Sequence, residues 1–139
     1  MTTYFDTSVL VCLHLNQGSF STKASALIAE TTKPLLINQF QTLEFQNAVM
    51  LGLFRKDSDI KSSTKAIAEY EANFKKGIFV ETHLNWDKVY KTATDFSRKY
   101  TGNIGARSLD VLHVAAAHVL KAKQFASFDK RQLSLAKLS

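Results

Sequence analysis

Cysteine and proline are almost absent from this chain of 139 residues, which has one of each, Cys12 and Pro34. A single cysteine cannot form a disulfide within the chain, so the fold cannot depend on a disulfide framework. Cys12 lies in an apolar run, where a small buried hydrophobe is a more common role than a reactive thiol. A reducing compartment suits this cysteine usage.

The sequence also lacks a long apolar run and a basic leader. A membrane-spanning helix needs about 20 apolar residues, and polar or charged residues interrupt every apolar run well before that length. Asp6 interrupts the N-terminal segment, which has no basic residue before it and so does not have the pattern of a signal peptide. We therefore expect a cytoplasmic protein without a membrane segment.

Three well-known catalytic motifs are missing as well. The chain has no glycine-rich phosphate loop, no Gly-x-Ser-x-Gly elbow and no His-Glu-x-x-His pair. These absences exclude the P-loop, serine hydrolase and zincin classes.

Positive charge is what the chain has in excess. Lysine and arginine number 18 against 12 acidic residues, which gives a formal net charge of +6. Cationic side chains that neutralise phosphates release condensed counterions, so this balance favours a polyanionic partner such as RNA. The length and the 45% content of hydrophobic residues indicate one globular domain over residues 1–139.

Short apolar runs alternate with longer helical patterns along the chain. The predicted strands are residues 3–5, 35–37, 78–80 and 124–128, and the predicted helices cover about 7–14, 22–31, 38–54, 57–76, 85–100, 108–120 and 129–138. This alternation predicts an α/β fold, a three-layer sandwich in which helices cover both faces of one short parallel sheet.

The helix over residues 38–54 has the clearest boundary signal. Asn38 can cap it, and Gln41 stands at the reciprocal position of a capping box. Because apolar residues occur on most of its surface, we expect this helix to be largely buried.

Four acidic residues stand where strands end or where the next helices begin. Asp6 and Asp129 directly follow the first and last strands, whereas Glu44 and Asp110 lie near the starts of two helices. Ligands of open parallel sheets bind outside the carboxyl ends of the strands. We therefore expect these four carboxylates to converge.

Convergence of four like charges needs a compensating cation. Two unit charges at ~4 Å repel by about 4 kcal/mol at an effective dielectric constant of 20. Oxygen ligands without a cysteine or histidine cluster suit Mg²⁺ or Mn²⁺. Such an ion can activate water and offset the charge of a phosphodiester in its transition state.

Each acid also has a purely structural interpretation. Asp6 and Asp129 could cap helices, and Asp110 could favour a helix dipole. Glu44 is harder to explain in this way, because it lies among apolar neighbours where an unpaired carboxylate loses hydration. His113, three residues after Asp110, could face the same way, but a packing histidine is the favoured interpretation.

In three segments the sequence resembles the PIN-domain family, and within it the VapC-like ribonucleases. The segments are YFDTSVL at residues 4–10, LEFQNA at 43–48, and SLDVLHVAAA at 108–117, which runs on to FDKRQ at 128–132. Two departures are mild: Ser127 stands where the family commonly has threonine, and Val111 follows Asp110 where alanine is common.

The resemblance implies a PIN-like sandwich and Mg²⁺- or Mn²⁺-dependent cleavage of RNA. It places the acidic site on Asp6, Glu44, Asp110 and Asp129, with supporting hydroxyls on Ser127 and Thr7. It also implies a homodimer and a small antitoxin protein as a partner, in the manner of toxin–antitoxin pairs.

Basic residues beside the acids are the expected contacts for RNA phosphates, namely Arg107, Lys130 and Arg131. Surface charges that aid solubility explain them nearly as well. Two other functions remain open. One is a module that binds RNA or protein without catalysis, and the other is a metal-dependent phosphatase, although a clear aspartyl nucleophile motif is missing.

Overall fold

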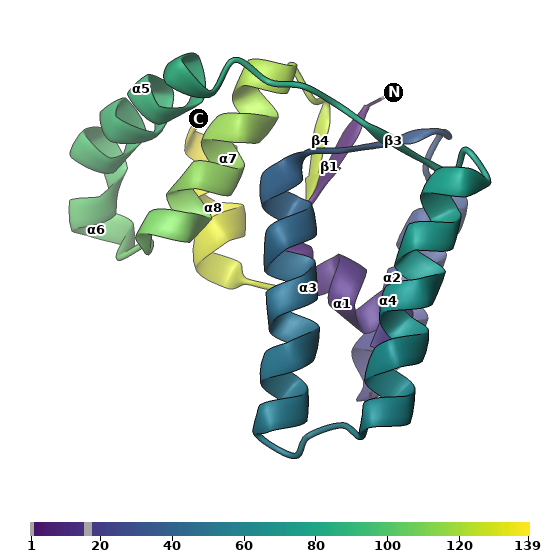
Figure 1. The fold of residues 1–139 in the computed structure, drawn as a ribbon. Coiled ribbons are helices and arrows are strands. Elements are labelled where there is room, and N and C mark those ends of the chain that lie inside the picture. The colour runs from purple at the N-terminus through teal and green to yellow at the C-terminus, as the bar shows by residue number, and fades with distance from the viewer. Residues whose placement is uncertain (1, 16–17) are drawn as a thin grey trace. The chain divides into compact units, whose positions relative to one another are not determined.

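The computed structural model describes residues 2–15 and 18–139, which form two compact units (Figure 1). Unit 1 consists of Met1–Asp6 and His83–Ser139, and unit 2 is Thr7–Thr82. Each unit holds one pair of parallel strands, and helices make up most of the rest.

Unit 1 is built on the pairing of β1 (Thr3–Phe5) with β4 (Gln124–Ala126). The strands run parallel, with Tyr4 opposite Phe125, and the rings of these two residues stack at 5.6 Å. Tyr4 and Phe5 are almost completely buried, as expected of an apolar strand in the core.

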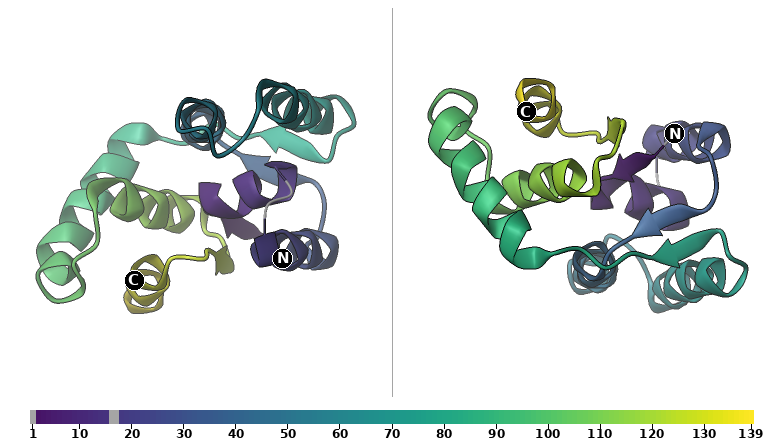
Figure 2. Two further views of the ribbon diagram at one scale, coloured as in Figure 1. Left: turned by 90° about the horizontal axis from the view of Figure 1, so that it is seen from below. Right: turned by 90° about the horizontal axis from the view of Figure 1, so that it is seen from above.

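The helices of unit 1 follow in the order α5 (Trp86–Phe96), the π-helical turn η1 (Ser97–Thr101), α6 (Gly102–Ile104), α7 (Ser108–Leu120) and α8 (Lys130–Leu138). Helix α7 lies between α5 and α8 (Figure 2). Residues 111–117 of α7 are all buried, which accounts for the continuous apolar run in the sequence. The left-handed backbone at Gly105, with φ of 73°, ends α6 before this helix begins.

Unit 2 contains a second parallel pair, β2 (Leu35–Ile37) with β3 (Phe79–Glu81). Its helices are α1 (Thr7–Leu15), α2 (Gly18–Glu30), α3 (Gln39–Phe54) and α4 (Ile60–Lys75). Helices α3 and α4 lie side by side (Figure 1). Aromatic rings hold this unit together, because Phe45 of α3 stacks on Tyr70 of α4 at 4.0 Å and both contact the buried His14.

The expected three-layer sandwich around one sheet is wrong. Within the described residues, about 69% is helix and 9% is strand, and the strands form two separate pairs. Each strand is three residues long and pairs with one described neighbour, so each two-stranded sheet offers little surface for a helical layer. The alternating pattern predicted the parallel pairing but not the division into two sheets.

The predicted burial of the helix at residues 38–54 is also wrong. The capping box of Asn38 and Gln41 is present, with hydrogen bonds of 2.8 and 2.9 Å. However, α3 exposes a set of large apolar side chains: Leu43, Met50, Leu51 and Phe54. One face of α3 packs inside unit 2 through Phe45 and Val49, and the apolar residues elsewhere on the helix remain accessible.

Other boundaries differ from the prediction by a few residues. Helix α2 begins at Gly18 rather than near residue 22, and α4 begins at Ile60 with Asp59 as its cap. Ser108 is the first residue of α7, and Arg107 takes the capping position. No helix in the described part of the chain is both long and apolar enough to span a bilayer.

Candidate functional site

Unit 1 brings together three of the predicted carboxylates, those of Asp6, Asp110 and Asp129, through short polar links. Asp6 follows β1, and its backbone N–H donates to the carbonyl of Ala126 at 2.9 Å, which continues the strand pairing by one residue. The side chain of Asp6 therefore projects from the end of the β1–β4 pair. It is 8% exposed, so its carboxylate needs polar partners.

Those partners come from the end of β4 and from α8. Gln132 Nε2 donates to Asp6 Oδ1 at 3.2 Å, and Ser127 Oγ lies 3.4 Å from Asp6 Oδ2. Ser127 Oγ also donates to Gln132 Oε1 at 2.6 Å. The predicted supporting role of Ser127 thus has a geometric basis. Gln132, which is completely buried, was not predicted, because a glutamine in an amphipathic helix carries no signal in the sequence.

A buried histidine and tyrosine form the other side of the Asp6 environment. His113 Nε2 lies 3.6 Å from Asp6 Oδ1, and His113 Nδ1 is 2.8 Å from the hydroxyl of Tyr4. His113 is 1% exposed, which agrees with a packing role. A carboxylate oxygen only accepts hydrogen bonds, so the arrangement suits the tautomer in which His113 Nε2 carries a hydrogen and Tyr4 donates to Nδ1.

Asp129 is connected to Asp6 through Ser127. The backbone N–H of Asp129 donates to Ser127 Oγ at 2.9 Å. Asp129 Oδ1 caps α8 by accepting from the backbone N–H groups of Arg131 and Gln132 at 2.8 and 3.2 Å. Asp129 is therefore a helix-capping residue, as its structural interpretation predicts. Its second oxygen, Oδ2, is not used by the cap.

Arg107 joins Asp129 to Asp110. Its Nε lies 3.4 Å from Asp110 Oδ2, and its Nη2 lies 3.9 Å from Asp129 Oδ2. The arginine side chain is 74% exposed, whereas those of Asp110 and Asp129 are 14% and 31% exposed. Arg107, whose contact with RNA phosphates stays a prediction, thus stands between two carboxylates, and Lys130 and Arg131 are exposed at the start of α8.

Glu44 belongs to unit 2, where it lies in the second turn of α3. Its Oε1 accepts a hydrogen bond of 2.8 Å from Thr7 Oγ1 at the start of α1. Thr7 is buried and Glu44 is half-buried, so this bond fixes the carboxylate at the α1–α3 contact. The predicted supporting hydroxyl of Thr7 therefore contacts Glu44.

The donor chemistry of unit 1 suits a hard cation. In the described ranges 2–15 and 18–139, no group of three or more His, Cys, Asp or Glu side chains stands close enough together to hold an ion. Asp110 and Asp129 nevertheless already share one positive charge, the guanidinium of Arg107. An exposed ion pair contributes only about 0–1 kcal/mol, so a divalent ion can compete with this side chain for the carboxylate oxygens.

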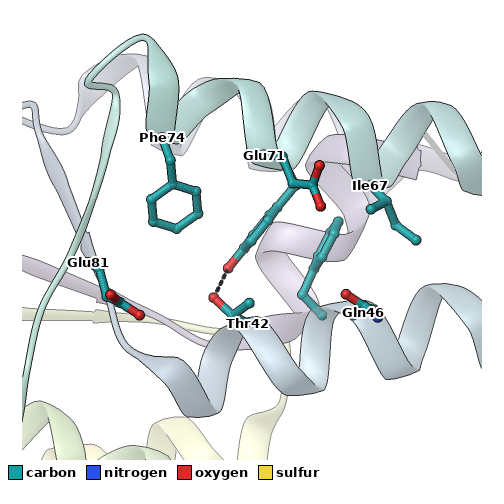
Figure 3. A pocket seen from close by; sticks show the side chains of 8 residues that line it. Thr42, Gln46, Ile67, Glu71, Phe74 and Glu81 are labelled. Atoms are coloured by element: carbon teal, nitrogen blue, oxygen red, sulfur yellow. Dashed lines mark hydrogen bonds between the residues drawn. The ribbon is translucent and has the colours of Figure 1, made fainter.

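Unit 2 carries a separate small pocket between α3, α4 and β3 (Figure 3). Phe45, Tyr70 and Phe74 give it an aromatic lining, and Glu71 and Glu81 bring carboxylates to it. The hydroxyls of Thr42 and Tyr70 are 2.9 Å apart. Burial is the main cause that raises the pKa of Tyr70 to about 12.

No model of a known protein family matches the sequence, and no characterised protein matches it. The resemblance to PIN-domain ribonucleases in three segments stays a prediction.

Proposed function

We propose that this protein is a metal-dependent endoribonuclease. The observation that carries the proposal is the arrangement of Asp6, Asp110 and Asp129 in unit 1, where Ser127 and Arg107 link three acids that are far apart in the sequence. A sequence under no functional constraint gains little from placing two carboxylates at one exposed arginine and linking a third to them through Ser127, since carboxylates repel one another.

In this proposal Asp6, Asp110 and Asp129 of unit 1 hold Mg²⁺ or Mn²⁺, and the metal-binding role of Glu44, which belongs to unit 2, stays a prediction from the sequence. A divalent cation on such ligands makes water a better nucleophile and offsets the negative charge that develops on a phosphodiester. Ser127 and Gln132 orient Asp6, and Thr7 orients Glu44. Preorganised ligands of this kind lower the cost of assembling the site.

Arg107, Lys130 and Arg131 are the proposed contacts for RNA phosphates. Arg107 becomes available for this role when a metal ion takes its place at Asp110 and Asp129. The net charge of +6 supports an RNA substrate, because each neutralised phosphate releases counterions. A cytoplasmic location is part of the proposal.

A protein partner is part of the proposal as well. The apolar side chains of Leu43, Met50, Leu51 and Phe54 are 68%, 43%, 37% and 81% exposed on α3. Exposed apolar side chains in such a set commonly mark protein interfaces. They support the predicted homodimer and the predicted binding of a small antitoxin. They equally favour the alternative function, a binding module without catalysis, so the activity has to be tested directly.

The test is cleavage of a structured RNA by the purified chain in Mg²⁺, in Mn²⁺ and in EDTA. Asp6→Asn and Asp110→Asn remove the charge with little change in size, and Asp95→Asn on the exposed surface of α5 is the matched control. We expect metal-dependent cleavage that both site variants lose and the control keeps. Equal cleavage by all variants, or none by the wild type on several RNAs, would support the binding module.

A further inference from the structure

Unit 1 has a hollow beside the proposed carboxylate site, between the α5–η1 segment and the first half of α7. Its volume is about 590 Å³. Pockets that hold small ligands typically measure about 300–1,000 Å³. The hollow is therefore large enough for a nucleotide.

The charge of the lining selects for an anion. Of the described residues that line the hollow, Arg98 alone carries a formal charge, and no carboxylate is among them. An arginine presents several N–H donors in a planar fork that matches phosphate oxygens. Asp110 lies close by in α7, but its carboxylate is directed to Arg107 and is not part of the lining.

Thr101, one of the residues that line the hollow, has a hydroxyl for which the described residues offer no partner. Thr101 Oγ1 is buried and, within the described residues, has no hydrogen bond. A helical threonine usually bonds the carbonyl four residues before it, as Thr94 does with Tyr90 at 3.0 Å. Thr101 ends the π-helical turn η1, where the backbone repeat is wider and this bond is not made. π-Helical turns occur frequently at functional sites.

The start of α7 adds further donors to the same hollow. Ser108 and Leu109 line it and are the first two residues of this 13-residue helix. The first N–H groups of an α-helix have no partner within the helix and lie at its positive end. Phosphate groups bind favourably at such positions.

An aromatic ring completes the lining. Tyr90 of α5 is 60% exposed, although a ring of this size gains from burial. Nucleic-acid bases stack on exposed aromatic side chains, and this interaction tolerates any base. Tyr90 and Arg98 are two turns apart on one face of α5 and η1, so a base and a phosphate can be held together.

We propose that this hollow binds one nucleotide of an RNA chain, with its phosphate at Arg98 and the start of α7 and its base against Tyr90. The role of that nucleotide as part of a cleaved substrate rests on the proposed function. Ser108 and Asp110 lie within one turn of α7, so the bound nucleotide is next to the proposed point of cleavage.

The experiment titrates the ¹⁵N-labelled full chain with AMP, with adenosine and with inorganic phosphate, without metal, and follows the amide signals. We expect AMP to bind saturably with shifts at Tyr90, Arg98 and Ser108. Arg98→Gln should weaken AMP binding about tenfold, as expected for loss of a charge-assisted contact. Tyr90→Leu should weaken AMP binding several-fold and leave inorganic phosphate binding unchanged.

Lys99→Gln is the matched control, because it removes the same charge from the neighbouring position of η1 and does not line the hollow. The proposal is overturned if Lys99→Gln and Arg98→Gln weaken AMP binding equally, or if AMP shifts no signal at the hollow. Binding of AMP there by a protein that cleaves no RNA would uphold the nucleotide site and contradict the nuclease. Cleavage of RNA without AMP binding at the hollow would uphold the nuclease and contradict the nucleotide site.

Discussion

The hydroxyl of Tyr4 offers a sharp test of the buried polar network around Asp6. Tyr4→Phe removes one oxygen and keeps the ring, which stacks on Phe125 within 5° of parallel. The variant removes the hydrogen bond of 2.8 Å between the Tyr4 hydroxyl and His113 Nδ1, at a residue that is 1% exposed. The effect of this substitution therefore reports the hydrogen bond rather than the packing.

The expected cost follows from the burial of the atoms that lose their bond. Loss of a hydrogen bond between buried polar atoms costs about 1–3 kcal/mol, because water does not reach these atoms to replace the bond. The cavity left by one hydroxyl is small and adds little. We therefore expect Tyr4→Phe to lower the free energy of unfolding by about 1–3 kcal/mol.

Urea unfolding measured by circular dichroism provides the assay, and Tyr100→Phe provides the control. The hydroxyl of Tyr100 donates to the carbonyl of Leu138 at 3.2 Å in an exposed setting. Water replaces that bond, so the control should change stability by no more than about 0.5 kcal/mol. Equal losses for both variants would refute the reasoning, since they would show that burial of His113 does not raise the cost.

Three further predictions concern other described groups. Tyr70 should ionise with a pKa of about 12 in a spectrophotometric titration, because burial raises this pKa; a difference between the wild type and Tyr70→Phe with its transition near 10 would contradict this. Burial lowers the pKa of His14 below its usual value of 6.5, against smaller opposing effects of its bond to the Leu10 carbonyl and of Glu69. As the pH falls, the unfolded chain therefore protonates this imidazole before the folded chain does. The contribution of His14 to the free energy of unfolding is complete above pH ~6.5 and falls below it by at most about 1.4 kcal/mol per pH unit. His14→Gln should flatten the stability profile below pH ~6.5, and an unchanged profile would exclude His14 as the source of this pH dependence. Asp129→Asn should keep the cap of α8, whereas Asp129→Ala should lower the free energy of unfolding in urea by about 0.5–2 kcal/mol. Both variants should weaken Mg²⁺ binding in calorimetry. Unchanged Mg²⁺ binding would remove Asp129 from the proposed metal site.

Local signals in the sequence predicted local structure well. Asn38 and Gln41 satisfy each other's backbone groups over three residues, so the capping box forms whatever the rest of the chain does. The strands at residues 3–5 and 35–37 are apolar runs that the core needs, and both form as predicted. Such features depend on neighbours in the sequence and can be read from it.

Features that depend on distant partners could not be read in the same way. The number of sheets depends on which strand ends meet, and three-residue strands leave that choice to the packing of the helices. The exposure of Leu43 and Phe54 shows a similar limit, because an apolar pattern does not distinguish a core from an exposed face. The bond from Gln132 to Asp6 spans 126 positions, and no spacing rule in one sequence indicates it.

At Asp129 a structural role and a functional role are compatible, although the sequence alone presents them as alternatives for each acid. A carboxylate has two oxygens, and a helix cap uses one of them. Asp129 Oδ1 accepts from the first N–H groups of α8, which fixes the side-chain torsions and directs Oδ2 toward Arg107. The cap thus holds the second oxygen in place without the entropy loss that a free side chain would suffer on binding an ion. Asp110 follows the same logic, since its Oδ2 accepts from the backbone N–H of Arg107 at the start of α7 while it also faces the guanidinium. Helix starts therefore supply carboxylates whose positions the fold has already set, and this is the property that a metal-binding site requires.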